Sequence, residues 1–226
     1  MKRLNLTVEG QTEQAFATSV LGPHLERFGV FVGKPRLTGL HARRKGRIPT
    51  GGLLNTFRHS LGDIRRWMRE DRSDDVRFSV MVDLYSLPRD FPGYDEAMSL
   101  SDPHDQAARL GESLSKELQD PRFIPYVQVH EFEALVLADV SCLAGWFEDA
   151  DKRIQDLASE CSAFATPEHI NHGRDSHPKA RIKRYFSDYD ENVDGPALVG
   201  QVGVSAIRQR CPHFSEWLTK LEQLDA

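Results

Sequence analysis

Acidic residues follow the apolar segments of the N-terminal half of this sequence. Glu9 comes directly after the segment RLNLTV, and Glu13 follows four residues later. Asp83 lies inside the run MVDLY, while Glu131 and Glu133 follow the segment FIPYVQVH. Carboxylates that are brought together repel one another unless they share a cation. Because hard oxygen ligands suit Mg²⁺ or Mn²⁺, a metal site held by Glu9, Asp83, Glu131 and Glu133 is one hypothesis for these acids.

The same acids also have a structural interpretation. Glu9 precedes one predicted helix and Glu131 begins another, and a carboxylate is favourable at the positive end of a helix. Glu131 and Glu133 can therefore be capping or solvated residues instead of ligands. His130 ends a predicted strand beside two acids, so it is either a satisfied core histidine or a group that orients a metal-bound water or acts as a general base.

The segments that would position these acids alternate between strand and helix. Apolar runs and apolar-polar alternation predict strands at residues 3–8, 30–40, 77–85 and 123–130. Apolar residues at helical spacing predict helices at about 13–28, 52–70 and 104–119. Thr12 is the expected cap of the first of these helices, and Pro23 is expected to kink it.

This alternation predicts an α/β fold, a mainly parallel sheet flanked by helices. In such a sheet ligands bind at the carboxyl ends of the strands, which is where the acids fall. Beyond residue 131 the pattern is helical, with predicted helices at 131–139, 151–163, 179–186, 197–210 and 213–224. The expected organisation is therefore an α/β core over residues 1–140 and a helical C-terminal extension, packed on the core, over residues 141–226.

The acid-bearing motifs resemble those of the Toprim superfamily. VEGQTE follows the first predicted strand, and VDLY lies in the third. That superfamily uses a strand-tip Glu followed by Gly, together with an Asp-x-Asp pair, to hold divalent metal for phosphoryl chemistry. The resemblance implies that Glu9 is the metal-binding glutamate and Asp83 the first aspartate of the pair.

The sequence departs from the Toprim pattern at the second aspartate, where Tyr85 stands. A tyrosine cannot replace a carboxylate ligand at neutral pH without a large pKa shift. Either Glu13, Glu131 or Glu133 supplies the missing charge, or the site is inactive.

More narrowly, the chain resembles a bacterial family of unknown function over residues 4 to about 218. The shared elements are the VEGxTE start, DxYxLP, PYVQVHEFEAL, a late Pro-Lys-x-Arg element and CPHFSEWL. Members of that family are often encoded beside ABC-type ATPases, of the overcoming-lysogenization-defect type, in phage-defence neighbourhoods. The resemblance implies a Toprim-like nuclease, a Mg²⁺- or Mn²⁺-dependent hydrolase of nucleic-acid phosphodiester bonds that serves as the effector of an ATPase-linked defence system. The alternative is a catalytically inactive adaptor or sensor for the partner ATPase.

Under the nuclease hypothesis the catalytic residues are Glu9, Asp83, Glu13, Glu131 and Lys179. Positive charge near the scissile phosphate is expected from Lys179 and Arg181, which match the late element of the family. A loop with Arg43, Arg44, Lys45 and Arg47 is expected to guide the nucleic acid. Arg58, Arg65, Arg69 and Arg72 are expected on one face of the following helix. Each of these three sets of basic residues can equally lie on a solvated surface, where its members pair with nearby acids.

Composition excludes several other classes. The net charge of −5 excludes a polycation that coats nucleic acid indiscriminately, and no apolar run approaches a membrane span, so we expect a cytoplasmic protein without membrane contact. The three cysteines are far apart, which argues against a disulfide framework or a paired-cysteine zinc site. The sequence contains no P-loop and no G-x-S-x-G motif. His169, His172 and His177 are either solvent-exposed loop histidines or a zinc cluster, and a homo-oligomer is compatible with the sequence.

Overall fold

The chain folds around a parallel β-sheet. The computed structural model describes residues 1–38, 57–170, 173 and 175–225. Strand β1 (Lys2–Val8) pairs with β4 (Val76–Asp83) at the centre of the sheet. On the other side of β1 lie β2 (Val30–Val32) and β3 (Arg36–Leu37), and on the other side of β4 lie β5 (Phe123–Ile124) and β6 (Val127–Gln128). All of these pairings are parallel, which confirms the predicted α/β class with a mainly parallel sheet.

Two of the predicted strands are each divided in two. The segment predicted as a strand over 30–40 pairs with β1 as β2 and β3, and Gly33 to Pro35 lie between them. The segment predicted over 123–130 forms β5 and β6, with Pro125 between them. Proline has no N–H to donate to a strand ladder, which explains why neither segment is continuous.

The first helical segment begins differently from the prediction. It consists of α1 (Gln11–Phe16), a π-helical turn at 17–21 and α2 (Gly22–Glu26). The prediction that Thr12 caps it is wrong, because Gly10 is the N-cap residue and its N–H donates to Glu13 Oε2 at 2.7 Å. The π-helical turn lies directly before Pro23, whose nitrogen carries no proton for the preceding turn, so the segment changes its helical pitch there.

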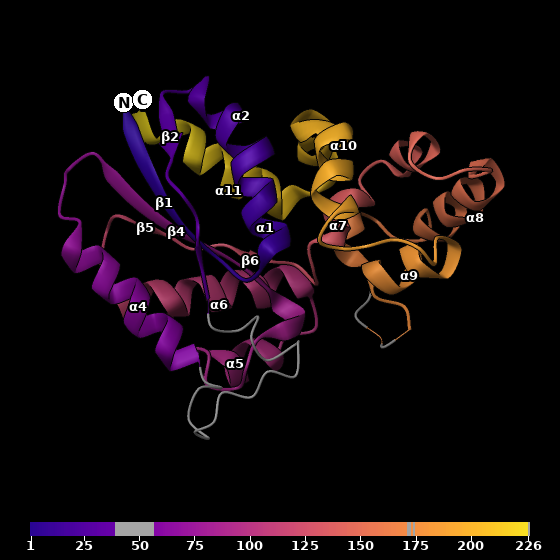
Figure 1. Cartoon of the computed structure of the whole chain (residues 1–226). Helices are drawn as coiled ribbons and strands as arrows, with labels where there is room; N and C mark the ends of the chain where they lie inside the picture. Colours follow the sequence, from indigo (N-terminus) through magenta and orange to yellow (C-terminus); the bar gives the residue numbers. More distant parts are fainter. Residues whose placement is uncertain (39–56, 171–172, 174, 226) are drawn as a thin grey trace, which may run out of the picture.

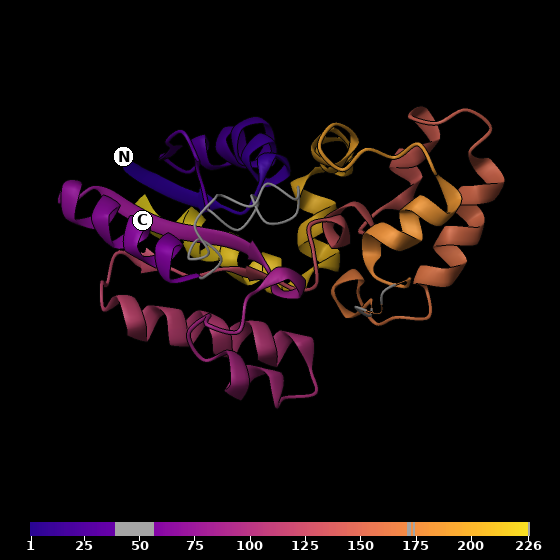
Figure 2. The same cartoon turned by 60° about the horizontal axis from the view of Figure 1, so that its bottom comes forward.

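Helices cover both faces of the sheet (Figures 1 and 2). On one face, Leu4, Leu6 and Val8 of β1 belong to an apolar cluster with residues of α1, α2, α10 (Asp194–Arg210) and α11 (Pro212–Glu222). On the other face, alternate residues of β4 pack with α4 (Phe57–Glu70), α5 (Tyr94–Met98) and α6 (Pro103–Leu118). The sheet is thus the middle of three layers, with each strand contributing alternate side chains to opposite faces.

The predicted C-terminal helices are present with changed lengths. The segment at 131–139 contains only the short α7 (Glu133–Val136), followed by α8 (Asp151–Cys161) and α9 (Pro178–Tyr185). Helix α10 is kinked at Gly203, which has φ 77°. Turns of 3₁₀ helix occupy Leu84–Ser86, Val140–Gly145, Pro167–His169 and Gln223–Asp225. The domain boundary near residue 140 stays a prediction, since one apolar cluster contains residues from both sides of it.

Helix α11 is fixed to the sheet by an aromatic residue. The Trp217 ring stacks on Tyr126 with 4.3 Å between centroids, and its Nε1 donates to Ser79 Oγ of β4 at 3.0 Å. Ser79 Oγ in turn donates to the Ile124 carbonyl of β5 at 2.6 Å. The last helix therefore completes a hydrogen-bond chain that crosses two strands.

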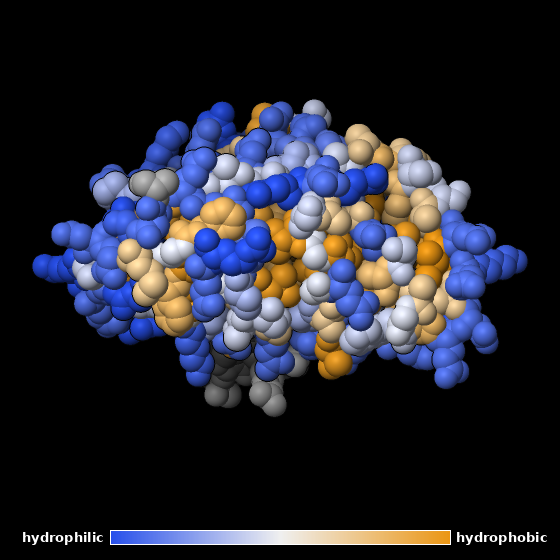
Figure 3. Space-filling view, turned by 90° about the horizontal axis from the view of Figure 1, so that it is seen from above, coloured by the Kyte–Doolittle hydropathy of each residue, from blue (hydrophilic) through white to orange (hydrophobic). Residues whose placement is uncertain are grey.

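Apolar and polar residues are distributed unevenly over the surface. Viewed from above, apolar residues gather toward the middle of the molecule and hydrophilic residues toward its two ends (Figure 3). Among the described residues, no helix combines the length and the apolar character needed to cross a lipid bilayer.

Replacing Trp217 tests the contact between α11 and the sheet. Trp217→Phe retains an aromatic ring but leaves Ser79 Oγ without its donor, so we expect a loss of about 1 kcal/mol in the free energy of unfolding. Urea denaturation followed by circular dichroism measures this change. Trp146→Phe is the matched control, because its indole N–H bonds Asp194 at an exposed position and its loss should cost less than about 0.5 kcal/mol. Equal costs for the two variants would contradict the role assigned to Trp217.

Candidate acidic site at the carboxyl end of the sheet

The parallel pairing of β1 and β4 brings Glu9 and Asp83 together. Val8 is in register with Met81, and the Glu9 N–H donates to the Met81 carbonyl at 3.1 Å. Glu9 Oε2 accepts hydrogen bonds from the Asp83 N–H at 3.0 Å and from Ser86 Oγ at 2.6 Å. Both acids are almost completely buried, with 3% of Glu9 and 2% of Asp83 exposed. The first two predicted ligands are therefore neighbours at the tips of adjacent strands.

Glu13 has two roles at the start of α1. Its Oε2 accepts the Gly10 N–H, which closes the first helical turn on the residue that follows Glu9. The carboxylate is buried and also faces the polar pocket described below. The capping interpretation and the proposed catalytic role thus apply to the same side chain.

Glu131 holds the start of α9. Directly before Glu131, the chain bends at His130, which has a left-handed backbone with φ 61°. Glu131 Oε1 lies 2.7 Å from His177 Nδ1 and accepts the Lys179 N–H at 2.6 Å. This carboxylate therefore anchors the first turn of α9, as an acid at the positive end of a helix does.

The Lys179 ammonium lies among three carboxylates. Its Nζ is 3.9 Å from Glu131 Oε2 and 4.0 Å from Glu133 Oε1, and it forms an ion pair with Glu191. Glu133 also accepts a hydrogen bond from the Tyr189 hydroxyl at 3.3 Å. The lysine offsets part of the negative charge that burial would otherwise leave uncompensated.

These segments enclose one polar pocket. Its lining comes from the tip of β1, the start of α1, the end of β4, the start of α7, the start of α9 and the segment before α10. The lining residues are Glu9, Gly10, Thr12, Glu13, Asp83, Phe132, Glu133, Lys179, Glu191 and Asn192. Of the acids and the lysine predicted for the site, Glu131 alone is not in this lining. Its carboxylate instead holds Lys179, through the backbone N–H and the ammonium of that residue.

The two acids near Lys179, Glu131 and Glu133, have pKa values that are shifted in opposite directions. Burial, followed by the negative charge of Glu131, raises the pKa of Glu133 to about 8. Burial also opposes ionisation of Glu131, but the hydrogen bond with His177 and the charge of Lys179 outweigh it and lower the pKa of that carboxyl. At neutral pH Glu131 is ionised and Glu133 carries a proton, an arrangement found where acids and bases are assigned different tasks.

The remaining predicted residues lie elsewhere. Arg181 Nε donates to the Ser176 carbonyl, and its guanidinium pairs with Glu160, outside the pocket lining, so its contact with phosphate stays a prediction.

The four arginines predicted on one helix face do not all lie on that helix. Arg58, Arg65 and Arg69 lie on α4, but Arg72 lies beyond the end of the helix at Glu70, so the prediction is wrong for Arg72. Arg65 pairs with Glu117 at 2.7 Å. The loop residues Arg43, Arg44, Lys45 and Arg47 lie outside the described residues.

Sequence reasoning missed several members of the site. Ser86 donates to Glu9, and the only sequence signal for it is a hydroxyl three residues after Asp83. Glu191 lies in a connecting segment and carries no motif. Tyr85, which stands where the Toprim pattern has its second aspartate, is 44% exposed and stacks on His177 with 5.6 Å between centroids. Tyr85 is thus outside the pocket lining, and the acids that surround Asp83 come from other segments.

The donor types in the pocket fit a hard divalent cation. Glu9, Glu13 and Asp83 offer carboxylate oxygens, and Glu133 offers them once it loses its proton, which is the ligand chemistry of Mg²⁺ and Mn²⁺. Their spacing is looser than a coordination shell. Within the part of the chain that the structure describes, the one set of three histidine, cysteine or acidic side chains whose ligand atoms lie within 4.8 Å of one another is at Asp102, His104 and His169.

The family described as "Domain of unknown function (DUF4276)" matches residues 8–222. The chain belongs to this family. The expectation of a family of unknown function is thereby confirmed. No curated protein matches the sequence. Among solved structures, the chain is similar to the C-terminal region of the OLD protein of Xanthomonas campestris pv. campestris, with 15% identity, 97% of each chain covered and a TM-score of 0.37. A TM-score of this size does not by itself establish a shared fold.

The raised pKa of Glu133 predicts a specific pH dependence for this family member. Between the ordinary value of 4.5 and about 8, the folded chain binds more protons at Glu133 than the unfolded chain does. The contribution of Glu133 to the free energy of unfolding therefore falls as pH rises through this window. Glu133→Gln cannot ionise, so we expect this variant to lose less stability than the wild type between pH 6 and pH 9.

Urea denaturation in buffer with EDTA, at pH 6, 7.5 and 9, measures the effect. Glu96→Gln, at an exposed position of α5, is the control and should follow the wild type. A Glu133→Gln profile parallel to that of the wild type would show that Glu133 is already ionised at pH 6.

Proposed function

We propose that this protein is a Mg²⁺- or Mn²⁺-dependent phosphodiesterase that acts on nucleic acid. The observation that carries the proposal is the pocket at the carboxyl ends of β1 and β4. There Glu9 and Asp83 lie beside each other, and Glu13, Glu133 and Lys179 line the same space. The carboxyl edge of a parallel sheet is where α/β proteins bind ligands, and phosphodiester cleavage uses both acidic metal ligands and a cation near the phosphate.

Glu9 and Asp83 are the proposed primary metal ligands. The Ser86 hydroxyl and the Asp83 N–H fix the orientation of the Glu9 carboxylate. Glu133 has to lose its proton before it can bind a cation, so we assign it, with Glu13, a supporting role. A bound divalent ion would supply a Lewis acid and an activated water for attack on phosphorus.

Lys179 is the proposed phosphate-binding residue. Its side chain is only 14% exposed, lines the pocket and is held by Glu131 and Glu191. A positioned ammonium stabilises the negative charge that develops on the transferred phosphoryl group. Because the net charge of the chain is −5, contact with nucleic acid has to be local, and the basic loop at residues 43–47 is the proposed guide for the strand.

A second candidate function is that of an adaptor without catalytic activity. The observation that favours it is that Lys179 already lies within 4.0 Å of Glu131 and Glu133 and pairs with Glu191, so that the lysine can substitute for a shared metal ion. In that case the protein would act as a sensor or adaptor for a partner ATPase of the ABC type. In the nuclease proposal the same ATPase would be the regulator of cleavage.

Substitution of the two strand-tip acids tests the nuclease proposal. We expect Glu9→Gln and Asp83→Asn each to lower the rate of cleavage by at least about 100-fold, because each removes a charge that stabilises the metal. The assay follows plasmid, single-stranded DNA and tRNA with Mg²⁺ or Mn²⁺, with and without the ATPase. Glu26→Gln at the end of α2 and Asp74→Asn at the amino end of β4 are exposed controls of matched type and should retain activity.

Calorimetric titration with Mn²⁺ separates the two candidate functions. The nuclease proposal requires Mn²⁺ binding by the wild type and weaker binding by Glu9→Gln and Asp83→Asn. Circular dichroism confirms that each variant is folded. Cleavage that both variants retain would overturn the assignment of the site. A wild type that neither cleaves nor binds Mn²⁺ would favour the adaptor.

A further inference from the structure

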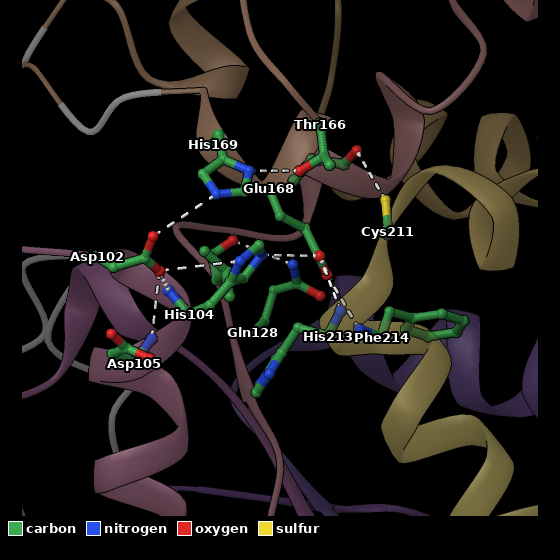
Figure 4. Close-up of polar contacts among 12 residues, drawn as sticks. Asp102, His104, Asp105, Gln128, Thr166, Glu168, His169, Cys211, His213 and Phe214 are labelled. Carbon is green, nitrogen blue, oxygen red and sulfur yellow. Dashed lines mark hydrogen bonds and ion pairs between the residues drawn. The ribbon is translucent and has the colours of Figure 1, made fainter.

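A second group of potential metal ligands lies at the start of α6 (Figure 4). Asp102, His104 and His169 each offer one ligand atom, and these atoms lie within 4.8 Å of one another. Asp102 Oδ1 is 3.9 Å from His104 Nδ1, and Asp102 Oδ2 is 3.8 Å from His169 Nε2. None of the three residues lines the acidic pocket. This group therefore has to be explained independently of the proposed nuclease site.

The backbone of α6 fixes Asp102. Asp102 is the N-cap residue of this helix, and its Oδ1 accepts the N–H of His104 at 2.8 Å and that of Asp105 at 3.4 Å. This geometry leaves Oδ2 directed toward His169, as Figure 4 shows. The carboxylate thus serves as a helix cap with one oxygen and faces the second histidine with the other.

Each histidine has its remote nitrogen engaged by a neighbour. His169 Nδ1 lies 2.8 Å from Thr166 Oγ1, and His104 Nε2 lies 3.1 Å from Glu168 Oε2. When ring N–H groups make these contacts, the near nitrogens, His104 Nδ1 and His169 Nε2, are left with lone pairs that can bind a metal ion. An imidazole whose remote N–H is held by a carboxylate or another acceptor is the usual arrangement around protein-bound metals.

The partner of His104 is itself firmly held. Glu168 is completely buried, and it accepts the N–H of His213 at 2.9 Å and that of Phe214 at 3.0 Å at the start of α11. The His104 and His169 rings pack edge to face with 4.3 Å between centroids. Side chains held in this way lose little further conformational freedom on binding an ion.

We propose that Asp102, His104 and His169 bind a divalent transition-metal ion of the Zn²⁺ type. Imidazole nitrogen and carboxylate oxygen both ligate zinc at about 2.0–2.2 Å, which in a tetrahedral site separates two ligand atoms by about 3.4 Å. With one oxygen from Asp102, the three ligand atoms lie within 4.8 Å of one another, so their separations need to close by at most about 1.4 Å. All three residues are partly exposed, so an ion can enter and a water can complete the coordination.

The metal ion would join distant parts of the chain. His104 and Asp102 belong to the start of α6, whereas His169 belongs to the 3₁₀ turn Pro167–His169. Glu168 connects that turn to the start of α11. The ion would therefore fasten a helix on one face of the sheet to the segment that orients the C-terminal helix on the other face.

Titration of the metal-stripped full chain with Zn²⁺ tests the proposal. We expect one Zn²⁺ bound at Asp102, His104 and His169 by calorimetry, and visible absorption of tetrahedral type when Co²⁺ replaces it. Asp102→Asn retains a capping side chain but loses the charge, and His169→Gln alters a half-exposed ligand, so both variants should fold. Each should weaken Zn²⁺ binding by at least about 10-fold, and Zn²⁺ should raise the thermal midpoint of the wild type alone.

Two control variants make the result specific. His59→Gln removes an exposed histidine on α4, and Glu26→Gln alters an exposed acid at the end of α2, so neither should change the affinity for Zn²⁺. No Zn²⁺ binding by the wild type, or equal affinity in Asp102→Asn and His169→Gln, would overturn the proposal. The group would then be an ion-pair network in which a protonated His104 bridges Asp102 and Glu168. Because Asp102, His104 and His169 are not in the lining of the acidic pocket, failure of this proposal leaves the nuclease proposal to its own test.

Discussion

The rest of the structure depends on one constraint. Several carboxylates at one end of the sheet are buried away from water. Glu9, Glu13, Asp83, Glu131 and Glu133 are each at most 5% exposed. A buried charge is tolerated only with hydrogen bonds or an opposite charge, and the chain supplies both from distant segments. Ser86 and the Asp83 N–H hold Glu9, while α9 brings His177 and Lys179 to Glu131.

This constraint explains why α9 belongs to the site although it lies far from the acids in sequence. Without Lys179, the pocket would contain carboxylates with no ammonium beside Glu133 and Glu191. Because Glu133 is protonated, the repulsion among the buried carboxylates is reduced further. The same proton makes Glu133 a weaker ligand for a cation. Structure and proposed chemistry therefore depend on the same balance of charge.

Much of the sheet could be predicted from the sequence, because its strands are apolar and its helices amphipathic. The Glu9 and Asp83 positions followed from the rule that ligands bind at the carboxyl ends of parallel strands. The contacts made by Lys179 could not be predicted, since they depend on how α9 packs against α7. The pairing of His104 with His169 was also missed. The sequence left His169, His172 and His177 as either exposed loop histidines or a zinc cluster. In the structure the ring of His177 lies against Glu131, and His172 is outside the described residues.

Helix α11 follows all of the described strands in sequence, yet it covers one face of the sheet and its Trp217 reaches β4. Until the ribosome has released this helix, Leu4, Leu6 and Val8 of β1 lack part of their apolar cover. A growing chain that lacks α11 thus has an incompletely covered sheet face, and such faces invite association with other chains. Folding of the sheet is expected to be complete only after α11 has been made, and until then to be sensitive to the supply of chaperones that shield apolar surface.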